Sequence, residues 1–317
     1  MVHFCIEYCQ LATERKMRVN REMALGLLLI VIAAVLFGTT GTAATYLHNI
    51  YGVDPLTVGV WRVFFGAPFL FVASLLMTRE TGLRVYKSHS SRILLFGIAV
   101  AGYQLSFFQA IIRTQIATAT LLTICIGPLI VALLARVFLQ ERLTARILAA
   151  LALALPGTVL ILGLHGMDAI LTPSYLFGNL LALTAALSYA TTIVVGKGLT
   201  GSLPPIQVMA LSFSTGALLL LPFASIPQNL PPAGWLILLY LGVFPTAISY
   251  ALLGAGLKKA TATSSSIAVL VEPLVATLLA VGFMGERLTV TGWVGAALLL
   301  TALVFLTCPF EKHKITE

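Results

Sequence analysis

Charged residues are scarce in this chain of 317 residues: only 9% are Asp, Glu, Lys or Arg, whereas 59% are hydrophobic. Soluble domains carry about 25% charged residues. So few charges cannot cover a surface that faces water, and the composition therefore excludes a soluble globular domain. We expect a polytopic membrane protein that is surrounded by a lipid bilayer.

Cysteine and histidine are also too few and too scattered to form a metal or redox site. The four cysteines have neither metal-ligand nor disulfide spacing, and we interpret them as free thiols. The five histidines lie in tails or at the ends of apolar segments. The stretch 196–198 lacks the first glycine and the Ser/Thr of a phosphate-binding loop. The sequence therefore predicts no metal, no cofactor and no ATP-driven motor.

Ten apolar segments are long enough to cross a bilayer, which requires about 20 helical residues. We predict an all-α fold with ten transmembrane helices, preceded by a polar tail (1–22) and followed by another (308–317). The predicted helices are Met23–Leu47, Leu56–Thr78, Ile93–Ile112, Ile116–Leu139, Ala145–Gly163, Tyr175–Gly196, Pro205–Ile226, Ala233–Leu257, Thr261–Met284 and Val290–Thr307.

An internal repeat divides the chain into two halves of five helices, 23–163 and 175–307. Three residue pairs, each of identical type, are separated by 145 positions: Thr118 and Thr263, Pro128 and Pro273, Glu141 and Glu286. Repeats of this kind have to be found before a fold is assigned. An odd number of crossings in each half would place the second half upside down, as in the inverted repeats of many secondary transporters.

The basic residues orient this arrangement. The net charge of +8 could suggest nucleic acid as a partner, but the basic residues do not cluster on one face. Lys and Arg accumulate in cytoplasmic loops of membrane proteins. With the N-terminus in the cytoplasm, all of the 19 except Arg62, Arg113 and Arg287 fall in inner loops and tails. We therefore predict that both termini are cytoplasmic and that no nucleic acid binds.

The turns that close the two repeats carry a family signature. Glu141-Arg142-Leu143-Thr144 and Glu286-Arg287-Leu288-Thr289 occupy matched places, and Val271-Glu272-Pro273-Leu274 lies within the ninth segment. In these motifs the chain resembles the drug/metabolite transporter superfamily, in its EamA-like branch, over about residues 24–307. The resemblance implies export or exchange of small metabolites, often amino acids, through a cavity between two inverted repeats of the inner membrane. It does not identify the substrate.

Glu272 is the first candidate for a functional residue, because it is the only acid well inside an apolar segment. It lies roughly 20 Å from either end of its segment, near the midplane of a bilayer core about 30 Å thick. An ionisable group at that depth is costly, which makes it a functional-site hypothesis. It could bind a substrate amine or a coupling proton, or it could be a packed acid that fixes a helix contact.

Arg62 lies about six residues into the second segment. Long basic side chains near helix ends reach back to the membrane interface, so snorkelling or structural pairing is one interpretation. The other is an anchor for a substrate carboxylate.

Polar and aromatic side chains of the third segment form another candidate site. Gln104, Phe107 and Phe108 share one helix face by their spacing. Together with Tyr103 they could line an organic substrate or simply pack between helices, and the same choice applies to Tyr189 and Tyr250. Pro128 and Pro273 are predicted to kink their helices. We interpret the Glu141-Arg142 and Glu286-Arg287 turns as structural.

Three classes of function remain, and a secondary transporter of a small-molecule substrate is favoured. An intramembrane enzyme would need paired acids, a nucleophile with its base, or a metal, and the sequence offers one buried acid. A membrane partner or sensor that does not transport is less consistent with an internal repeat. The sequence leaves the substrate, the direction of transport, the coupling ion and the oligomeric state open, and a homodimer is compatible with it.

Overall fold

The computed structural model describes residues 2–78, 82–163, 170, 172–284 and 289–307. Helices and turns make up this part of the chain, which contains no strand. Nine of its helical stretches are long and apolar enough to span a membrane, and Val290–Leu306 is apolar but shorter. The predicted all-α polytopic fold is therefore confirmed, whereas the number of ten crossings stays a prediction.

The helices follow the predicted segments closely. In chain order they are α1 (Val2–Tyr51), α2 (Pro55–Met77), α3 (Gly82–Arg113), α4 (Ile116–Phe138), α5 (Ala145–Leu162), η3 (Pro173–Tyr175), α6 (Leu176–Thr200), α7 (Pro205–Leu220), η4 (Leu221–Phe223), α8 (Pro232–Gly242), η5 (Val243–Ile248), α9 (Ser249–Lys259), α10 (Ala262–Val269), α11 (Val271–Met284) and α12 (Val290–Thr307). Two boundaries differ clearly. Residues 2–22 continue α1 instead of forming a separate tail, and α3 begins at Gly82 instead of Ile93.

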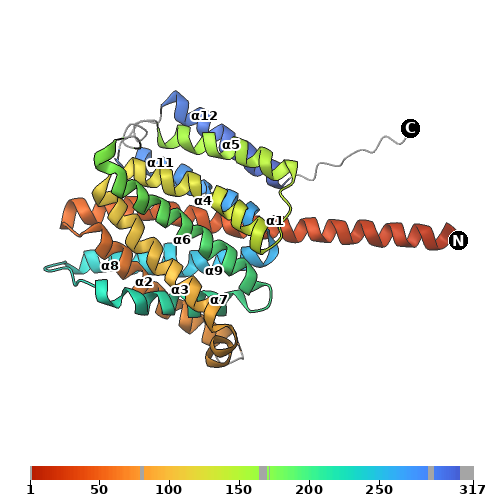
Figure 1. Cartoon of the computed structure of the whole chain (residues 1–317), viewed down its shortest axis with the longest axis horizontal. Helices are drawn as coiled ribbons and strands as arrows, with labels where there is room; N and C mark the ends of the chain where they lie inside the picture. Colours follow the sequence, from red (N-terminus) through yellow and green to blue (C-terminus); the bar gives the residue numbers. More distant parts are fainter. Residues whose placement is uncertain (1, 79–81, 164–169, 171, 285–288, 308–317) are drawn as a thin grey trace.

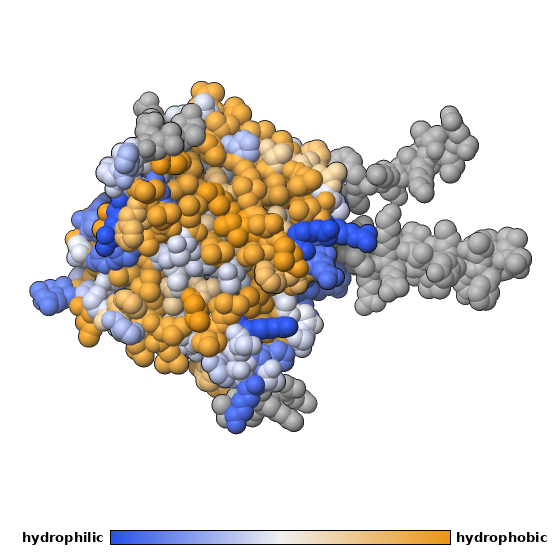
Figure 2. Space-filling view, viewed as in Figure 1, coloured by the Kyte–Doolittle hydropathy of each residue, from blue (hydrophilic) through white to orange (hydrophobic). Residues whose placement is uncertain are grey.

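The bundle has two polar ends with an apolar surface between them. The N-terminal part of α1 projects from one end, which we call the N-side, and α1 ends at Tyr51 on the opposite end, the far side (Figure 1). Figure 2 shows a broad hydrophobic band between hydrophilic side chains that gather at these two ends. Such a band is what a bilayer core requires of the protein surface.

Local sequence signals set where the helices begin. Asp54 caps α2 by accepting a hydrogen bond from the backbone N–H of Thr57 at 3.2 Å. Thr144 and Thr289 cap α5 and α12 in the same way. Proline stands at the first position of α7 and of α8, where its missing N–H costs nothing.

Two of the predicted segments are not continuous α-helices. The ninth segment breaks at Leu270, between α10 and α11, two residues before the predicted interruption at Glu272-Pro273. The cause is Pro273, which has no N–H to donate to the carbonyl of Val269 four residues earlier. In the eighth segment, η5 is one turn of π-helix around Pro245 that joins α8 to α9.

The two halves of the chain pack against each other throughout. Helix α3 lies against α6 and α7, and α1 lies against α9 and α11. Helices α5 and α12 pair along the top of the view in Figure 1. At their crossing a Cβ built on Gly157 would lie 2.8 Å from the carbonyl oxygen of Gly295, so only glycine allows this approach.

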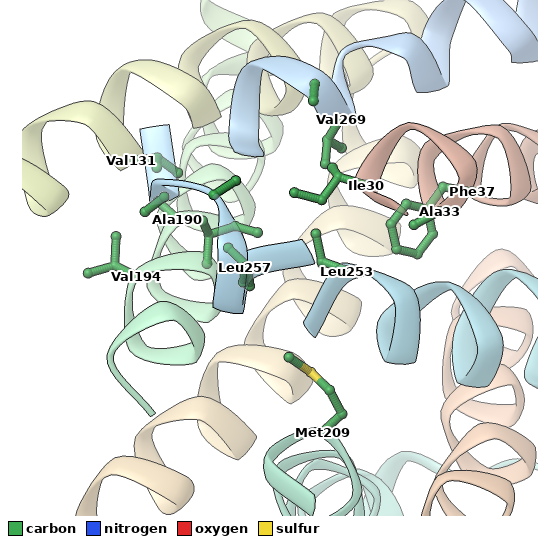
Figure 3. Close-up of a cluster of buried hydrophobic side chains, with 14 of the residues drawn as sticks. Ile30, Ala33, Phe37, Val131, Ala190, Val194, Met209, Leu253, Leu257 and Val269 are labelled. Atoms are coloured by element: carbon green, nitrogen blue, oxygen red, sulfur yellow. The ribbon is translucent and has the colours of Figure 1, made fainter. Parts of the chain in front are cut away.

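The hydrophobic core lies mainly in the N-side half of the bundle. Figure 3 shows Ile30 of α1, Val131 of α4, Val194 of α6 and Leu257 of α9 converging there, all of them buried. Side chains from both halves of the chain thus fill this end. The far-side half is packed differently, and it contains the candidate site.

Candidate functional site

A cavity of about 390 Å³ occupies the far-side half of the bundle. It is lined by residues of α1, α2, α3, α4 and α11, together with the end of α5. Its lining reaches His48 and Asn49, which are exposed near the far end of α1, and extends inward to Glu272. The cavity therefore opens on the far side and ends at the level of the break between α10 and α11.

Glu272 lies at the inner end of this cavity, in the first turn of α11. Its side chain is half-buried, and it forms no hydrogen bond or ion pair within the described part of the chain. Gly38 allows α1 to approach α11 closely at this point, because a Cβ there would lie 2.9 Å from the carbonyl oxygen of Glu272. A carboxylate held in this way is free to bind a cation or a proton from the cavity.

Arg62 does not reach back to the membrane interface, as the snorkelling interpretation expected. It is buried, with 7% of its surface exposed, and it lines the cavity. Its Nε donates to Thr246 Oγ1 at 3.1 Å, and its Nη2 lies 3.4 Å from the carbonyl oxygen of Pro245. A guanidinium has five N–H donors, so these contacts fix it in place and leave donors for a ligand.

The π-helical turn explains why Thr246 can hold this arginine. Pro245 cannot donate to the carbonyl of Leu241, and the Thr246 hydroxyl donates to that carbonyl instead, at 2.8 Å. The hydroxyl oxygen is thereby left as an acceptor that points toward Arg62. A π-bulge of this kind often marks a functional position in a helix.

Arg62 and Glu272 thus line one cavity from different helices. They form no ion pair with each other in the part of the chain that the structure describes. Two opposite charges that line one cavity without a direct ion pair can bind a ligand that carries both signs. The sequence identified both residues but could not show that they meet.

The aromatic residues of α3 divide between two places. Tyr103, Phe107 and Phe108 line the cavity, and the rings of Tyr103 and Phe107 stack with centroids 5.5 Å apart. Gln104 is 2% exposed and lines a small void next to Tyr189 and Tyr250 instead of the cavity. Gln104 and Phe108 nevertheless face α2 together, because a Cβ on Gly59 would lie 3.2 Å from Gln104 Oε1 and closer still to Cδ2 of Phe108. A shared role of Gln104, Phe107 and Phe108 in binding a substrate stays a prediction.

Several lining residues were not predicted as part of a site. Thr45, His48 and Asn49 line the outer part of the cavity on α1, and Thr120 of α4 lines it as well. His48 Nδ1 lies 3.1 Å from the carbonyl oxygen of Val53, which orients the ring. Polar residues spaced three or four apart near the end of an apolar segment were the signal that could have found them.

On the N-side, polar contacts join the two halves of the chain. Glu141, in the link between α4 and α5, accepts hydrogen bonds from the backbone N–H groups of Ala262 and Thr263 at 2.6 and 3.1 Å, and from the Thr263 hydroxyl at 2.9 Å. A carboxylate at a helix N-terminus satisfies unpaired donors and the helix dipole together. Lys197 also donates to the carbonyl of Leu257, at 2.7 Å.

We expect Glu141→Gln to lower the melting temperature of the purified protein, because a charge-assisted hydrogen bond stabilises by about 1.5–3 kcal/mol. The adjacent Arg142 is exposed and forms no hydrogen bond or ion pair with another described residue, so Arg142→Gln is the matched control and should leave the melting temperature unchanged. Equal melting temperatures for both variants would show that the Glu141 contact does not hold the N-side together.

Three further predictions concern the prolines Pro128 and Pro273 and the second Glu-Arg turn. Pro128 lies inside α4, which continues through it from Ile116 to Phe138. Pro273 lies in the first turn of α11, just after the break. Glu286 and Arg287 lie outside the described residues.

Comparisons with known proteins agree with this picture. The model of the EamA-like transporter family matches residues 24–163 and 176–308. The chain is 31% identical over 293 residues to the "Uncharacterized transporter YwfM" of Bacillus subtilis, covering 92% of this chain and 96% of that one. It is 33% identical over 288 residues to an "Uncharacterized transporter" of Archaeoglobus fulgidus, covering 90% and 97%.

A protein of known crystal structure shares the fold, with a TM-score of 0.75 and 23% sequence identity, over 89% of this chain and 97% of that chain. The apolar helices and the named relatives together indicate an integral, multi-pass membrane protein involved in transport. Families of this kind are generally not enzymes. The chain belongs to the EamA-like transporter family.

Proposed function

We propose that this protein is a secondary transporter, an exporter or exchanger, of small organic metabolites that carry both an amine and a carboxylate, such as amino acids. The observation that supports this most is the unpaired placement of Arg62 and Glu272 in one cavity. Arg62 would bind the carboxylate, Glu272 would bind the ammonium group, and Tyr103 and Phe107 would contact the apolar part of the substrate. Sites of this kind combine apolar walls with a few placed polar groups.

Alternating access is the mechanism that this geometry supports. The cavity opens on the far side, while the apolar core and the Glu141 contact close the N-side. Rocking of the two repeats about the level of Glu272 would open the N-side and close the far side. In this proposal the N-side faces the cytoplasm and contains both termini, and the membrane is the inner membrane, as the distribution of basic residues predicts.

The packing of the helices supports an inverted repeat. A two-fold exchange of the halves would turn the α3–α6 contact into the α1–α9 contact, and the α4–α6 contact into the α1–α11 contact. All four contacts are present. The α5–α12 pair would map onto itself, and it is also present.

A binding experiment tests the roles of the two charges. Purified protein is heated with an amino acid, with the amine that lacks its carboxylate, and with the acid that lacks its amine. A ligand at a hundred times its Kd stabilises a protein by about 2.7 kcal/mol. We expect the amino acid to raise the melting temperature most.

Arg62→Leu should abolish the rise in melting temperature that the acid causes and keep the rise that the amine causes. Arg62→Lys keeps the charge and should retain part of both rises. Equal stabilisation of wild type and Arg62→Leu by the acid would contradict the assignment of Arg62.

A further inference from the structure

Two small voids lie beyond the inner end of the large cavity, and the first shares Glu272 and Tyr103 with the lining of that cavity. The first, of about 30 Å³, is lined by Glu272, Tyr103, Tyr189 and the break residues Val269 and Leu270, among others. The second, of about 10 Å³, is lined by Tyr103, Gln104, Tyr189, Thr192 and Tyr250, together with Val100. Tyr103 and Tyr189 line both voids, so the two are neighbours.

The walls of these voids contain polar atoms without partners. The hydroxyl of Tyr189 and the Oε1 of Gln104 are buried and form no hydrogen bond. Gln104 is 2% exposed, so bulk solvent does not reach it. Val269 also lines the first void, and its carbonyl cannot accept a hydrogen bond from Pro273, which has no N–H. An unsatisfied buried polar group costs about 1–3 kcal/mol, and two of them around adjoining voids call for a common ligand.

The size and chemistry of the voids fit water. A buried water needs roughly 10–15 Å³ and two to four polar partners. The first void offers the Glu272 carboxylate, the Tyr189 hydroxyl and the Val269 carbonyl, and the second offers the Gln104 amide and the hydroxyls around it. The substrate cavity reaches Glu272 from the far side, and the second void extends along α6 from Tyr189 to Thr192.

We propose that these two voids hold ordered water bound by Glu272, Tyr189 and Gln104, and that this water is the route by which Glu272 exchanges its proton. One proton moves between Glu272 and this water, and no bond other than O–H bonds forms or breaks. The hydration site stands on the geometry alone. Its role in coupling rests on the proposed transport function.

The sign of a stability change tests whether the voids contain water. Tyr189→Phe removes the hydroxyl and leaves the ring. If the voids are hydrated, the variant loses a hydrogen bond and its melting temperature falls. If they are dry, it loses an unsatisfied polar group and its melting temperature rises or stays unchanged, which would overturn the proposal.

Infrared spectroscopy provides a second readout that does not depend on transport. The carboxyl band of Glu272 is identified by its loss in Glu272→Gln. We expect Tyr189→Phe and Gln104→Leu to shift this band, and we expect the wild-type band to respond to exchange of H₂¹⁶O for H₂¹⁸O. Tyr240→Phe is the matched control, because the Tyr240 hydroxyl donates to Thr39, which lines neither void. If neither of the two substitutions nor the exchange of water shifts the Glu272 band, the proposal is also overturned.

The coupling role is tested last, in proteoliposomes. We expect Tyr189→Phe to retain substrate binding in the heating assay but to lose at least half of the stimulation of uptake by a pH gradient. Full stimulation in the variant would refute the route while leaving the hydration site intact. Absence of substrate binding in the wild type would instead count against the proposed function.

Discussion

Replacing Glu272 with Gln is expected to reduce uptake of substrate into proteoliposomes at least tenfold, which corresponds to about 1.4 kcal/mol. The amide keeps the shape of the side chain but can neither balance an ammonium group nor exchange a proton. Because Glu272 forms no hydrogen bond or ion pair with another described residue, its replacement breaks no direct protein contact of the carboxylate, and the Gln amide can still bind the proposed water. The melting temperature should therefore stay the same or rise.

Glu272→Asp is the matched control for this prediction. It keeps the charge in the cavity with a side chain shorter by one methylene, and it should restore part of the uptake. Wild-type uptake by Glu272→Gln would show that Glu272 has a packing role, which was the alternative interpretation of its place in the sequence.

Gly38→Ala is expected to have a comparably large effect although it adds only one methyl group. A Cβ at Gly38 would lie 2.7 Å from the Cβ of Val275 and 2.9 Å from the carbonyl oxygen of Glu272, so α11 has to move away from α1. Overpacking of this kind costs about 1–3 kcal/mol. The shift would displace the Glu272 carboxylate, and we expect uptake to fall more than fivefold with a lower melting temperature.

Gly41→Ala is a closely matched control because it lies on the same helix and also lines the cavity. A Cβ there meets no atom within 4 Å. Both substitutions change helix propensity equally, so any difference between them reflects the contact with α11. Similar uptake by the two variants would show that the close approach of α1 to α11 does not position Glu272.

The sequence predicted the membrane class and most helix boundaries because apolar length and proline positions act locally. It also predicted Glu272 and Arg62 as candidates, since any ionisable residue in an apolar segment is costly. It could not predict that both line one cavity, because that depends on how α2 packs against η5 and α1 against α11. The snorkelling interpretation of Arg62 failed for this reason, since Thr246 comes from a helix 184 positions away.

The same limit applies to Tyr189. Gly127 occupies the place in the first repeat that Glu272 occupies in the second, and the sequence shows only that a side chain is missing there. In the structure a Cβ on Gly127 would lie 3.0 Å from Cδ1 of Tyr189, so the Tyr189 ring occupies the space that a side chain at position 127 would need. Only the packing of α4 against α6 reveals that contact.

The central claim is tested most directly by uptake into proteoliposomes of three labelled compounds. They are an amino acid with an apolar side chain, its amine-only analogue and its acid-only analogue. The account predicts that the amino acid is taken up at least tenfold faster than either analogue, and that Arg62→Leu and Glu272→Gln each remove this preference. Equal uptake of all three compounds, or a preference that persists in both variants, would contradict a site in which the two charges bind opposite ends of one substrate.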